Sequence, residues 1–344
     1  MKKTLTSALE TFARLIPLSV YPRLVRRDLI DFFYHAVSDN PMPHVRQLYP
    51  VVPVADFEAA LLYLKTNCTF VDYAQVQAYV FGGVPLPPKA VHLSFDDGYA
   101  ECFSVVCPLL LKHQIPCTFF LTTSLIDNQI LFYRNKQSLC VERVKDPSFK
   151  LPLSSLNDFL PANHAPFSTL DEFIAWFKDL RLSDGPLIDE ICRALGVDWQ
   201  AFLSETQPYL TTAQIRQMHA EGFTLGSHTL THRKLMDLPA AEIETEIADS
   251  CQIVAEITGQ VGVPFSFPHS AWGLDRGLLA DIRARHPEIG LLFDTKGLHG
   301  DVKFIHNRIW AERRGARALS EHLREAYQET WVEEILGLGR RLRS

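Results

Sequence analysis

The sequence predicts an α/β protein built from a parallel sheet or barrel of βα units. Short apolar runs recur between turn residues, and most of them are followed by a helical pattern. The runs are rich in Val, Ile, Leu and Phe, as in strands that are buried on both faces. We expect strands at Ile30–Val37, Ala90–Phe95, Cys117–Thr122, Phe223–Ser227, Val263–Phe267, Gly290–Asp294 and Phe304–Trp310.

Length and composition indicate a folded chain with a full core. The 344 residues are 47% hydrophobic and 22% charged, which suits one large α/β domain or two small ones. The formal net charge of -6 gives no global basic field, so we expect no nucleic acid partner. The seven cysteines are odd in number and contain no C-x-x-C pair, which favours a reducing compartment.

The N-terminal region predicts a helical segment over residues 1–28. Charged residues interrupt its apolar run, so we expect neither a signal peptide nor a spanning helix. Leu15–Ile30 contains three arginines among aliphatic residues, which favours an amphipathic helix docked on the protein and leaves peripheral membrane contact as the alternative. The expected location is therefore cytoplasmic, with membrane association left open. A C-terminal helix is expected within residues 313–344.

The βα rhythm stops between Ser124 and Leu210. Polar and proline-containing stretches alternate there with helical fragments at Leu170–Leu180 and Leu187–Leu195. A structureless loop of this length is improbable in a compact domain, so we expect a helical insertion that folds locally and flanks the site.

Two polar motifs stand at the ends of predicted strands. Asp96 and Asp97 follow one strand in a strand-to-helix turn, and His228 and His232 follow another. Because the carboxyl ends of parallel strands share one face, the two motifs can meet. Two histidines four apart would point to one side of a helical turn and, with a carboxylate, form a three-ligand metal site with an open position for water. Either motif alone is more often an ordinary turn or a structural histidine pair; their combination favours the metal site.

These motifs resemble the polysaccharide deacetylase (NodB-homology, carbohydrate esterase family 4-like) family. Ser94–Gly98 resembles its first signature, His228–His232 its second, and Phe265–Pro268 its third. Phe33–His35 and His306–Ile309 are similar to its opening and last strands, so the likeness runs from about residue 29 to about 312. It implies a catalytic domain over 29–312, a distorted (β/α) barrel with fewer than eight βα units and the insertion at about 124–210.

The resemblance also implies the site residues. Asp96 would be the general base, and Asp97, His228 and His232 would bind a divalent metal, expected to be zinc although other divalent metals are compatible. The signature arginine that orients the base would fall near Phe265, so this role is either lost or passed to another cation such as Arg308. The backbone N–H after Pro268 would support the oxyanion. Three histidines are candidates for the general acid: His306, His269 and His35.

The implied reaction is removal of N-acetyl groups from an amino sugar in a glycan, glycolipid or lipid-linked oligosaccharide during envelope polysaccharide synthesis. Cleavage of a formamide or other amide by the same site is an alternative, as is a metal- or carbohydrate-binding module without activity. The insertion is expected to contact substrate through Phe132 and Arg134, since rings stack on sugars and arginine binds anions. Pro268 and Trp272 are further candidate substrate contacts.

Overall fold

The computed structural model describes residues 9, 11–17, 20–25, 27–160, 165–312 and 319–336. Its centre is a nine-stranded sheet in the order β8-β7-β6-β5-β4-β3-β1-β9, with β2 paired to β3 and all neighbours parallel. The strands are β1 (Leu29–Tyr34), β2 (Thr69–Phe70), β3 (Ala90–Phe95), β4 (Thr118–Leu121), β5 (Thr224–Ser227), β6 (Val263–Ser266), β7 (Ile289–Asp294), β8 (Ile305–Asn307) and β9 (Ile309–Trp310).

The sheet is a nearly closed, distorted parallel barrel. Its two outermost strands, β8 and β9, follow each other in the chain and are separated only by Arg308. β8 pairs with β7 while β9 pairs with β1, so one continuous segment bridges the two edges of the sheet. The expected strand Phe304–Trp310 is therefore divided at Arg308, and this division puts Arg308 where the barrel closes.

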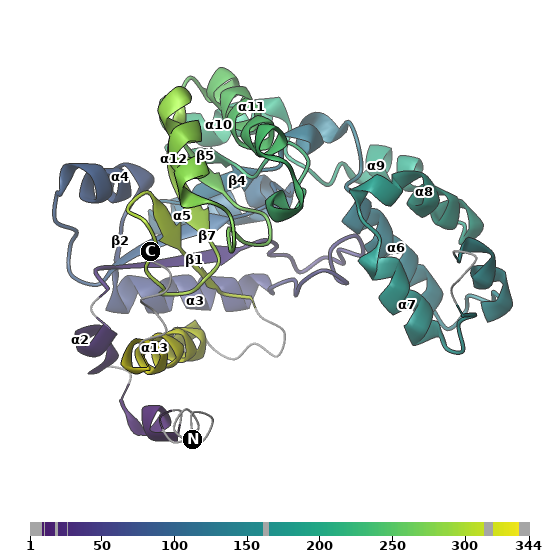
Figure 1. The fold of residues 1–344 in the computed structure, drawn as a ribbon, viewed down its shortest axis with the longest axis horizontal. Coiled ribbons are helices and arrows are strands. Elements are labelled where there is room, and N and C mark those ends of the chain that lie inside the picture. Colours follow the sequence, from purple (N-terminus) through teal and green to yellow (C-terminus); the bar gives the residue numbers. More distant parts are fainter. Residues whose placement is uncertain are drawn as a thin grey trace.

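Helices follow most strands and cover the outside of the barrel, with α3 on the opposite side from α10, α11 and α12 (Figure 1). The sequence explains their ends: the side chain of Thr211 caps α10 in a capping box with Gln214, and Gly259 ends α11 in the left-handed conformation. These helices are α3 (Val54–Asn67), α4 (Tyr73–Gly82), α5 (Cys107–His113, preceded by a π-helical turn at Cys102–Val106), α10 (Thr212–Ala220), α11 (Ala240–Thr258) and α12 (Arg276–Arg285).

A helical lobe projects from the barrel between β4 and α10 (Figure 1). It has its own hydrophobic core, centred on buried residues such as Phe173, Phe177 and Ile191. This local core is what the broken βα rhythm predicts. The helices are α6 (Tyr133–Lys145), α7 (Leu170–Asp179), α8 (Gly185–Ala194) and α9 (Trp199–Thr206), joined by 3-10 turns at Thr123–Asn128, Leu153–Phe159 and Leu182–Asp184.

The terminal segments pack against each other beside α3 (Figure 1). Tyr21 of α2 (Tyr21–Val25) stacks on Tyr327 of α13 (Leu319–Ile335), with ring centroids 5.8 Å apart. Among the described residues, no helix is both long and apolar enough to cross a membrane. The predicted 1–28 segment and 313–344 helix fall partly outside the described residues.

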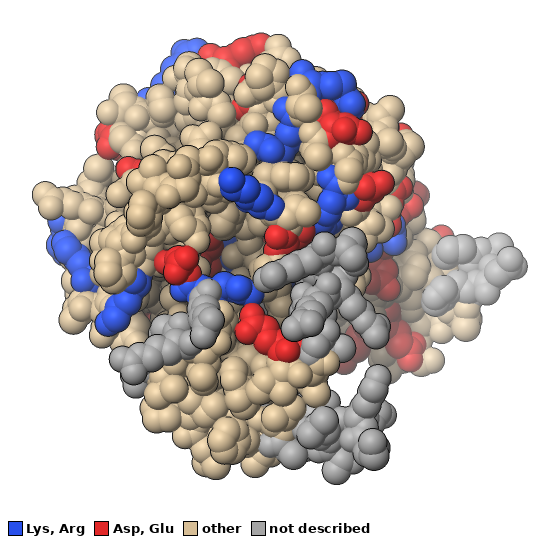
Figure 2. Space-filling view, turned by 60° about the vertical axis from the view of Figure 1, so that its left-hand side comes forward, with Lys and Arg blue, Asp and Glu red and all other residues tan. Residues whose placement is uncertain are grey.

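Charge on the face shown in Figure 2 is mixed. Lysine and arginine side chains are interspersed with aspartate and glutamate, and neither sign forms one continuous patch there.

Candidate metal and catalytic site

The candidate site lies at the carboxyl ends of the barrel strands. Asp96 and Asp97 directly follow β3, and His228 directly follows β5. A cavity of about 430 Å³ opens there. It is lined by Phe33, His35, Leu48, Tyr49, Asp96, Phe132, Arg134, His228, His232, Phe267, His269, Thr295 and Trp310.

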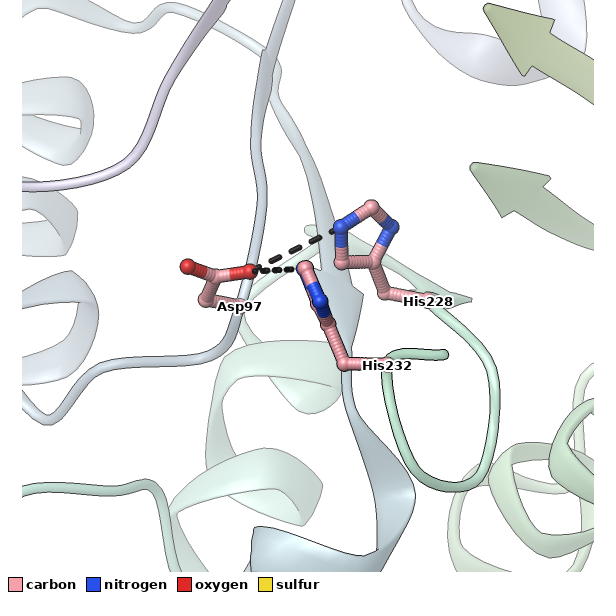
Figure 3. Close-up of side chains that lie close together, drawn as sticks. All are labelled: Asp97, His228 and His232. Carbon is pink, nitrogen blue, oxygen red and sulfur yellow. Dashed lines mark ion pairs between the residues drawn. The ribbon is translucent and has the colours of Figure 1, made fainter. Parts of the chain in front are cut away.

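Asp97, His228 and His232 form a compact cluster of metal-ligand atoms (Figure 3). The Oδ1 atom of Asp97 is 3.5 Å from Nε2 of His228 and 3.3 Å from Nε2 of His232. All three ligand atoms lie within 4.8 Å of one another. Among the described residues, this is the one such group of three or more histidine, cysteine or carboxylate side chains.

The surroundings of the cluster fit a divalent metal. Nδ1 of His228 lies 2.8 Å from the carbonyl oxygen of Ser266, and donation to this carbonyl leaves Nε2 with its lone pair directed at the cluster. Oδ1 of Asp97 is buried without a hydrogen-bond donor among the described residues. Two imidazole nitrogens and one carboxylate oxygen are also the ligand types that zinc accepts, so the residues fit the ion that the resemblance implies.

Backbone conformation, rather than a helical turn, brings the two histidines together. The segment after β5 is irregular, and both Thr229 and His232 have positive φ angles, 71° and 57°. The hydroxyl of Thr229 accepts a hydrogen bond from the backbone N–H of His232 at 2.8 Å. The helical turn that we expected from the spacing is therefore wrong, although the side chains converge.

The Asp96–Gly98 turn is equally specialised. Asp97 and Gly98 both have positive φ angles, 73° and 76°, which are costly for residues other than glycine. A Cβ atom on Gly98 would lie 3.0 Å from the side chain of Leu121. The turn directs adjacent carboxylates differently, Asp97 to the histidine cluster and Asp96 to Arg308.

Arg308 holds Asp96 in a fully buried, bidentate ion pair. Its two terminal nitrogens each donate to one carboxylate oxygen at 2.8 Å, and they also donate to the hydroxyls of Ser94 (3.0 Å) and Ser266 (2.6 Å). Burial alone would raise the pKa of Asp96, but the charge of Arg308 holds that pKa below its ordinary value. The third-signature position is occupied by Phe265, and an arginine from the barrel closure contacts the carboxylate instead.

His35 lines the same cavity and is paired with Glu312. Its Nδ1 is hydrogen-bonded to one oxygen of Glu312, and its backbone N–H donates to the other at 3.0 Å. Burial would lower the pKa of His35, but the neighbouring carboxylate outweighs it and raises the pKa to about 9. With Nδ1 committed to Glu312, Nε2 is the nitrogen left for a cavity ligand.

The structure separates the three candidate acids. His269 is exposed at the rim of the cavity, with its ring 5.3 Å from that of His232. His306 lies in β8, and its Nδ1 is 3.9 Å from a carboxylate oxygen of Asp31. It lines a different cavity. The structure therefore does not bring His306 to the site.

The candidate substrate contacts divide in the same way. Phe132 and Arg134 line the cavity, and the ring of Phe132 is 4.9 Å from that of His232. Trp272 is 59% exposed and does not line the cavity, and Pro268 is buried and does not line it either. Sequence reasoning missed Tyr49 and Glu312, because nothing in their local pattern distinguishes them from residues of an ordinary loop.

Fold and site together define an α/β barrel protein with a candidate metal site at the carboxyl ends of its strands. The sequence profile of the family described as "Polysaccharide deacetylase" matches residues 83–165 and 176–281, more than half of the chain. The chain therefore belongs to the polysaccharide deacetylase family.

Solved structures of low sequence identity share the fold. The deacetylase PplD of Streptococcus pyogenes, solved with acetate, is 15% identical with a TM-score of 0.53, and the match covers 87% of this chain and 97% of that one. IcaB of Ammonifex degensii is 17% identical with a TM-score of 0.52, covering 88% and 97%.

Curated relatives match over a short region. The poly-beta-1,6-N-acetyl-D-glucosamine N-deacetylase of Escherichia coli (strain K12) is 42% identical over 57 residues, which is 17% of this chain. The matched region is 8% of that protein's length.

Proposed function

We propose that this chain is a metal-dependent N-deacetylase that releases acetate from an N-acetylated amino sugar in a glycan, glycolipid or lipid-linked oligosaccharide. The observation that carries the proposal is the convergence, in one cavity, of the Asp97–His228–His232 cluster with a separate carboxylate, Asp96. A binding module needs the ligands but not the second carboxylate. The named activity of the matched Escherichia coli relative supports an N-acetylglucosamine-containing substrate.

The cluster has a defined place in the proposed reaction. Asp97, His228 and His232 would hold a divalent metal, which when bound would supply Lewis acidity towards the acetyl oxygen and would make a nearby water easier to deprotonate. Asp96 accepts the proton that the attacking water gives up, while Arg308 keeps this carboxylate ionised and fixes its two oxygens.

His35 completes the reaction as the general acid. The bond between the acetyl carbon and the sugar nitrogen breaks, and an amine cannot leave as an anion at neutral pH. His35 donates a proton to that nitrogen from Nε2, because Glu312 holds Nδ1 and keeps the ring charged. The products are acetate and the free amino sugar. His269 is the alternative donor; its exposed position and its place beside the metal ligand His232 make it the weaker candidate.

Zinc content and acetate release test the proposal together. The purified protein should hold about one zinc per chain, and zinc-loaded protein should release acetate from N-acetylglucosamine oligosaccharides. His232→Ala should lose the metal and the activity, because removing one of three ligands weakens binding severely. Zinc-loaded protein that binds these oligosaccharides without releasing acetate would instead support the binding-module reading.

We also propose that the N-terminal segment contacts a lipid surface, which would suit a lipid-linked substrate. Phe12 and Leu15 are 57% and 77% exposed, although Phe12 also contacts the ring of Trp331. Co-sedimentation with anionic phospholipid vesicles should fall in Phe12→Ser/Leu15→Ser, and equal sedimentation of the variant would contradict the proposal. The cytoplasmic location stays a prediction.

A further inference from the structure

A chain of hydrogen-bonded side chains runs from the metal-ligand cluster into the inserted helical lobe. The hydroxyl of Tyr49 donates to Oδ2 of Asp97 and lies 3.0 Å from the hydroxyl of Tyr99. Nδ2 of Asn135 donates to the hydroxyl of Tyr99 at 3.1 Å. Oδ1 of the same amide accepts from the hydroxyl of Tyr209 at 2.5 Å.

The far end of this chain is attached to the backbone of the lobe. The hydroxyl of Tyr209 accepts from the backbone N–H of Phe132, the residue that precedes α6, at 3.1 Å. Asn135, which is fully buried in α6, also donates to the carbonyl of His44 at 2.8 Å. Each group has a partner on both sides, and a fully satisfied buried network of this kind holds its members in place.

Tyr49 contacts both Asp97 and His35 in the candidate site. Its hydroxyl occupies Oδ2 of Asp97, so Oδ1 is the oxygen left facing the two imidazole nitrogens. Its ring stacks on that of His35, with centroids 4.0 Å apart and an angle of 17°. Hydrogen bonds to the outer oxygen of a ligating carboxylate orient it and contribute to metal affinity.

We propose that Tyr49 is a positioning residue for the metal ligand Asp97, held in place by the Tyr99–Asn135–Tyr209 chain. The inserted lobe therefore supports the metal site as well as flanking it. This inference rests on the metal site of the proposed function, and it is independent of which amide the enzyme cleaves.

Zinc affinity measured by competition with a chromogenic chelator tests the role of Tyr49. Tyr49→Phe keeps the ring on His35 and removes the hydroxyl, and it should weaken zinc binding by about 10- to 100-fold. Asn135→Ala should weaken it in the same direction. The melting temperature of metal-free Tyr49→Phe, measured in parallel, shows whether the variant is folded.

Tyr73→Phe is the matched control. The hydroxyl of Tyr73 also has two buried partners, accepting from Leu291 N–H at 2.9 Å and donating to the carbonyl of Gly262 at 3.0 Å, but it lies outside the site. This control should keep wild-type zinc affinity. Unchanged zinc affinity in Tyr49→Phe, or an equal loss of zinc affinity in Tyr73→Phe, would overturn the inference about Tyr49 and would leave the proposed function standing. A wild-type protein that binds no zinc would overturn the proposed function with it.

A second and independent observation concerns a basic groove beside the metal cavity. A neighbouring cavity of about 890 Å³ shares Arg134 and His269 with the metal cavity, so the two adjoin. Five lysine and arginine side chains line it against two aspartates, although the whole chain carries a net charge of -6. The cations are Arg134, Lys178, Arg181, Arg233 and Lys234, and the carboxylates are Asp179 and Asp237.

Not all of this positive charge is neutralised within the groove. Arg181 and Lys234 both pair with Asp237. Arg233 pairs with Glu242 and Glu246 of α11. Arg134, at the junction of the two cavities, donates to the hydroxyl of Tyr133 and has no carboxylate partner among the described residues. Counting Glu242 and Glu246 with the two aspartates, the five cations of the groove still exceed its carboxylates by about one charge, and the groove adjoins the metal cavity.

We infer that the groove binds an anionic substituent, a carboxylate or phosphate, of the saccharide beside the reacting acetamide. This inference rests on the proposed function and specifies its substrate class. Cations in a groove that adjoins the metal cavity attract anions, and they repel the ammonium group of a sugar that has already lost its acetyl group. The preferred substrate is therefore an acidic, still acetylated saccharide.

Binding constants for two oligosaccharides of equal length test the groove. N-acetylheparosan hexasaccharide carries glucuronate carboxylates, whereas N-acetylchitohexaose is neutral. The wild type should bind the acidic one more tightly, and the preference should shrink as salt rises. Arg181→Gln/Lys234→Gln should weaken only the acidic ligand, by about three- to tenfold, since exposed ion pairs contribute roughly 0.2–1 kcal/mol each.

Arg285→Gln is the control, because Arg285 is half-exposed on α12, pairs with Glu244 and does not line the groove. It should leave both binding constants unchanged. Equal binding of the two saccharides, or tighter binding of the neutral one, would overturn the groove inference. Acetate release, measured separately, reports on the proposed function without depending on this preference.

Discussion

Replacing Arg308 with methionine should destabilise the protein through Asp96. The substitution keeps an apolar stem of similar length but removes four donated hydrogen bonds, two of them to the Asp96 carboxylate. Both side chains are almost completely buried, so Asp96 would keep a charge in the barrel without its hydrogen-bonded cation. Breaking such a pair on one side costs about 3–5 kcal/mol.

This free energy corresponds to a measurable change in melting temperature. Unfolding entropy scales with chain length, and for 344 residues about 3–5 kcal/mol corresponds to roughly 4–7 °C. The assay is thermal unfolding of the metal-free protein at pH 7 to 8, followed by circular dichroism. Arg308→Met/Asp96→Asn should recover at least about half of the loss, because the double variant has no unpaired charge.

The pH dependence has a defined sign. In the wild type the pKa of Asp96 is lowered by Arg308, so the ion pair stabilises the fold above the unfolded carboxyl pKa of about 3.9 and loses this contribution as the pH falls. In Arg308→Met, burial raises that pKa instead. The difference in melting temperature between the wild type and Arg308→Met should therefore be largest near neutral pH. It should become smaller at lower pH, as Asp96 takes up a proton.

Arg283→Met separates this effect from the loss of any partly buried arginine. Arg283 donates to the carbonyl of Gly290 and packs on the rings of Phe81 and Phe304, and it has no carboxylate partner among the described residues. Its loss should be smaller and nearly independent of pH. A wild-type melting temperature in Arg308→Met, or a gap that is the same at every pH, would refute the reasoning.

Three further predictions concern the roles of individual side chains. Asp97→Asn should lower zinc affinity, whereas Asp96→Asn should keep the metal and lose about 100- to 10,000-fold in kcat; equal metal loss would contradict this division of roles. Glu312→Gln should shift the high-pH limb of the kcat profile to lower pH, because the general acid His35 must be protonated and its pKa of about 9 depends on that carboxylate; an unshifted limb would exclude His35 as the acid. Arg134→Ala should raise KM for an extended acidic glycan without changing metal content, and an unchanged KM would indicate a structural role.

Short-range patterns were enough to predict most of the barrel strands and the metal-ligand cluster. Buried parallel strands need continuous apolar runs, so β3 could be bounded at Ala90–Phe95 from its composition alone. The position of Asp97 and His228 just after their strands predicted that they would meet, because parallel strands end on one face. The two-residue strand β2 carries too little pattern to be recognised.

Only the tertiary structure decided which partners surround the cluster. The ion pair of Asp96 with Arg308 joins residues 212 positions apart, and the pairing of His35 with Glu312 spans 277. Sequence reasoning could name Arg308 as a candidate cation, but its contact with Asp96 requires the barrel to close between β8 and β9. The sequence determined local periodicity and residue chemistry; contacts across the barrel depend on strand order and closure, which no local pattern encodes.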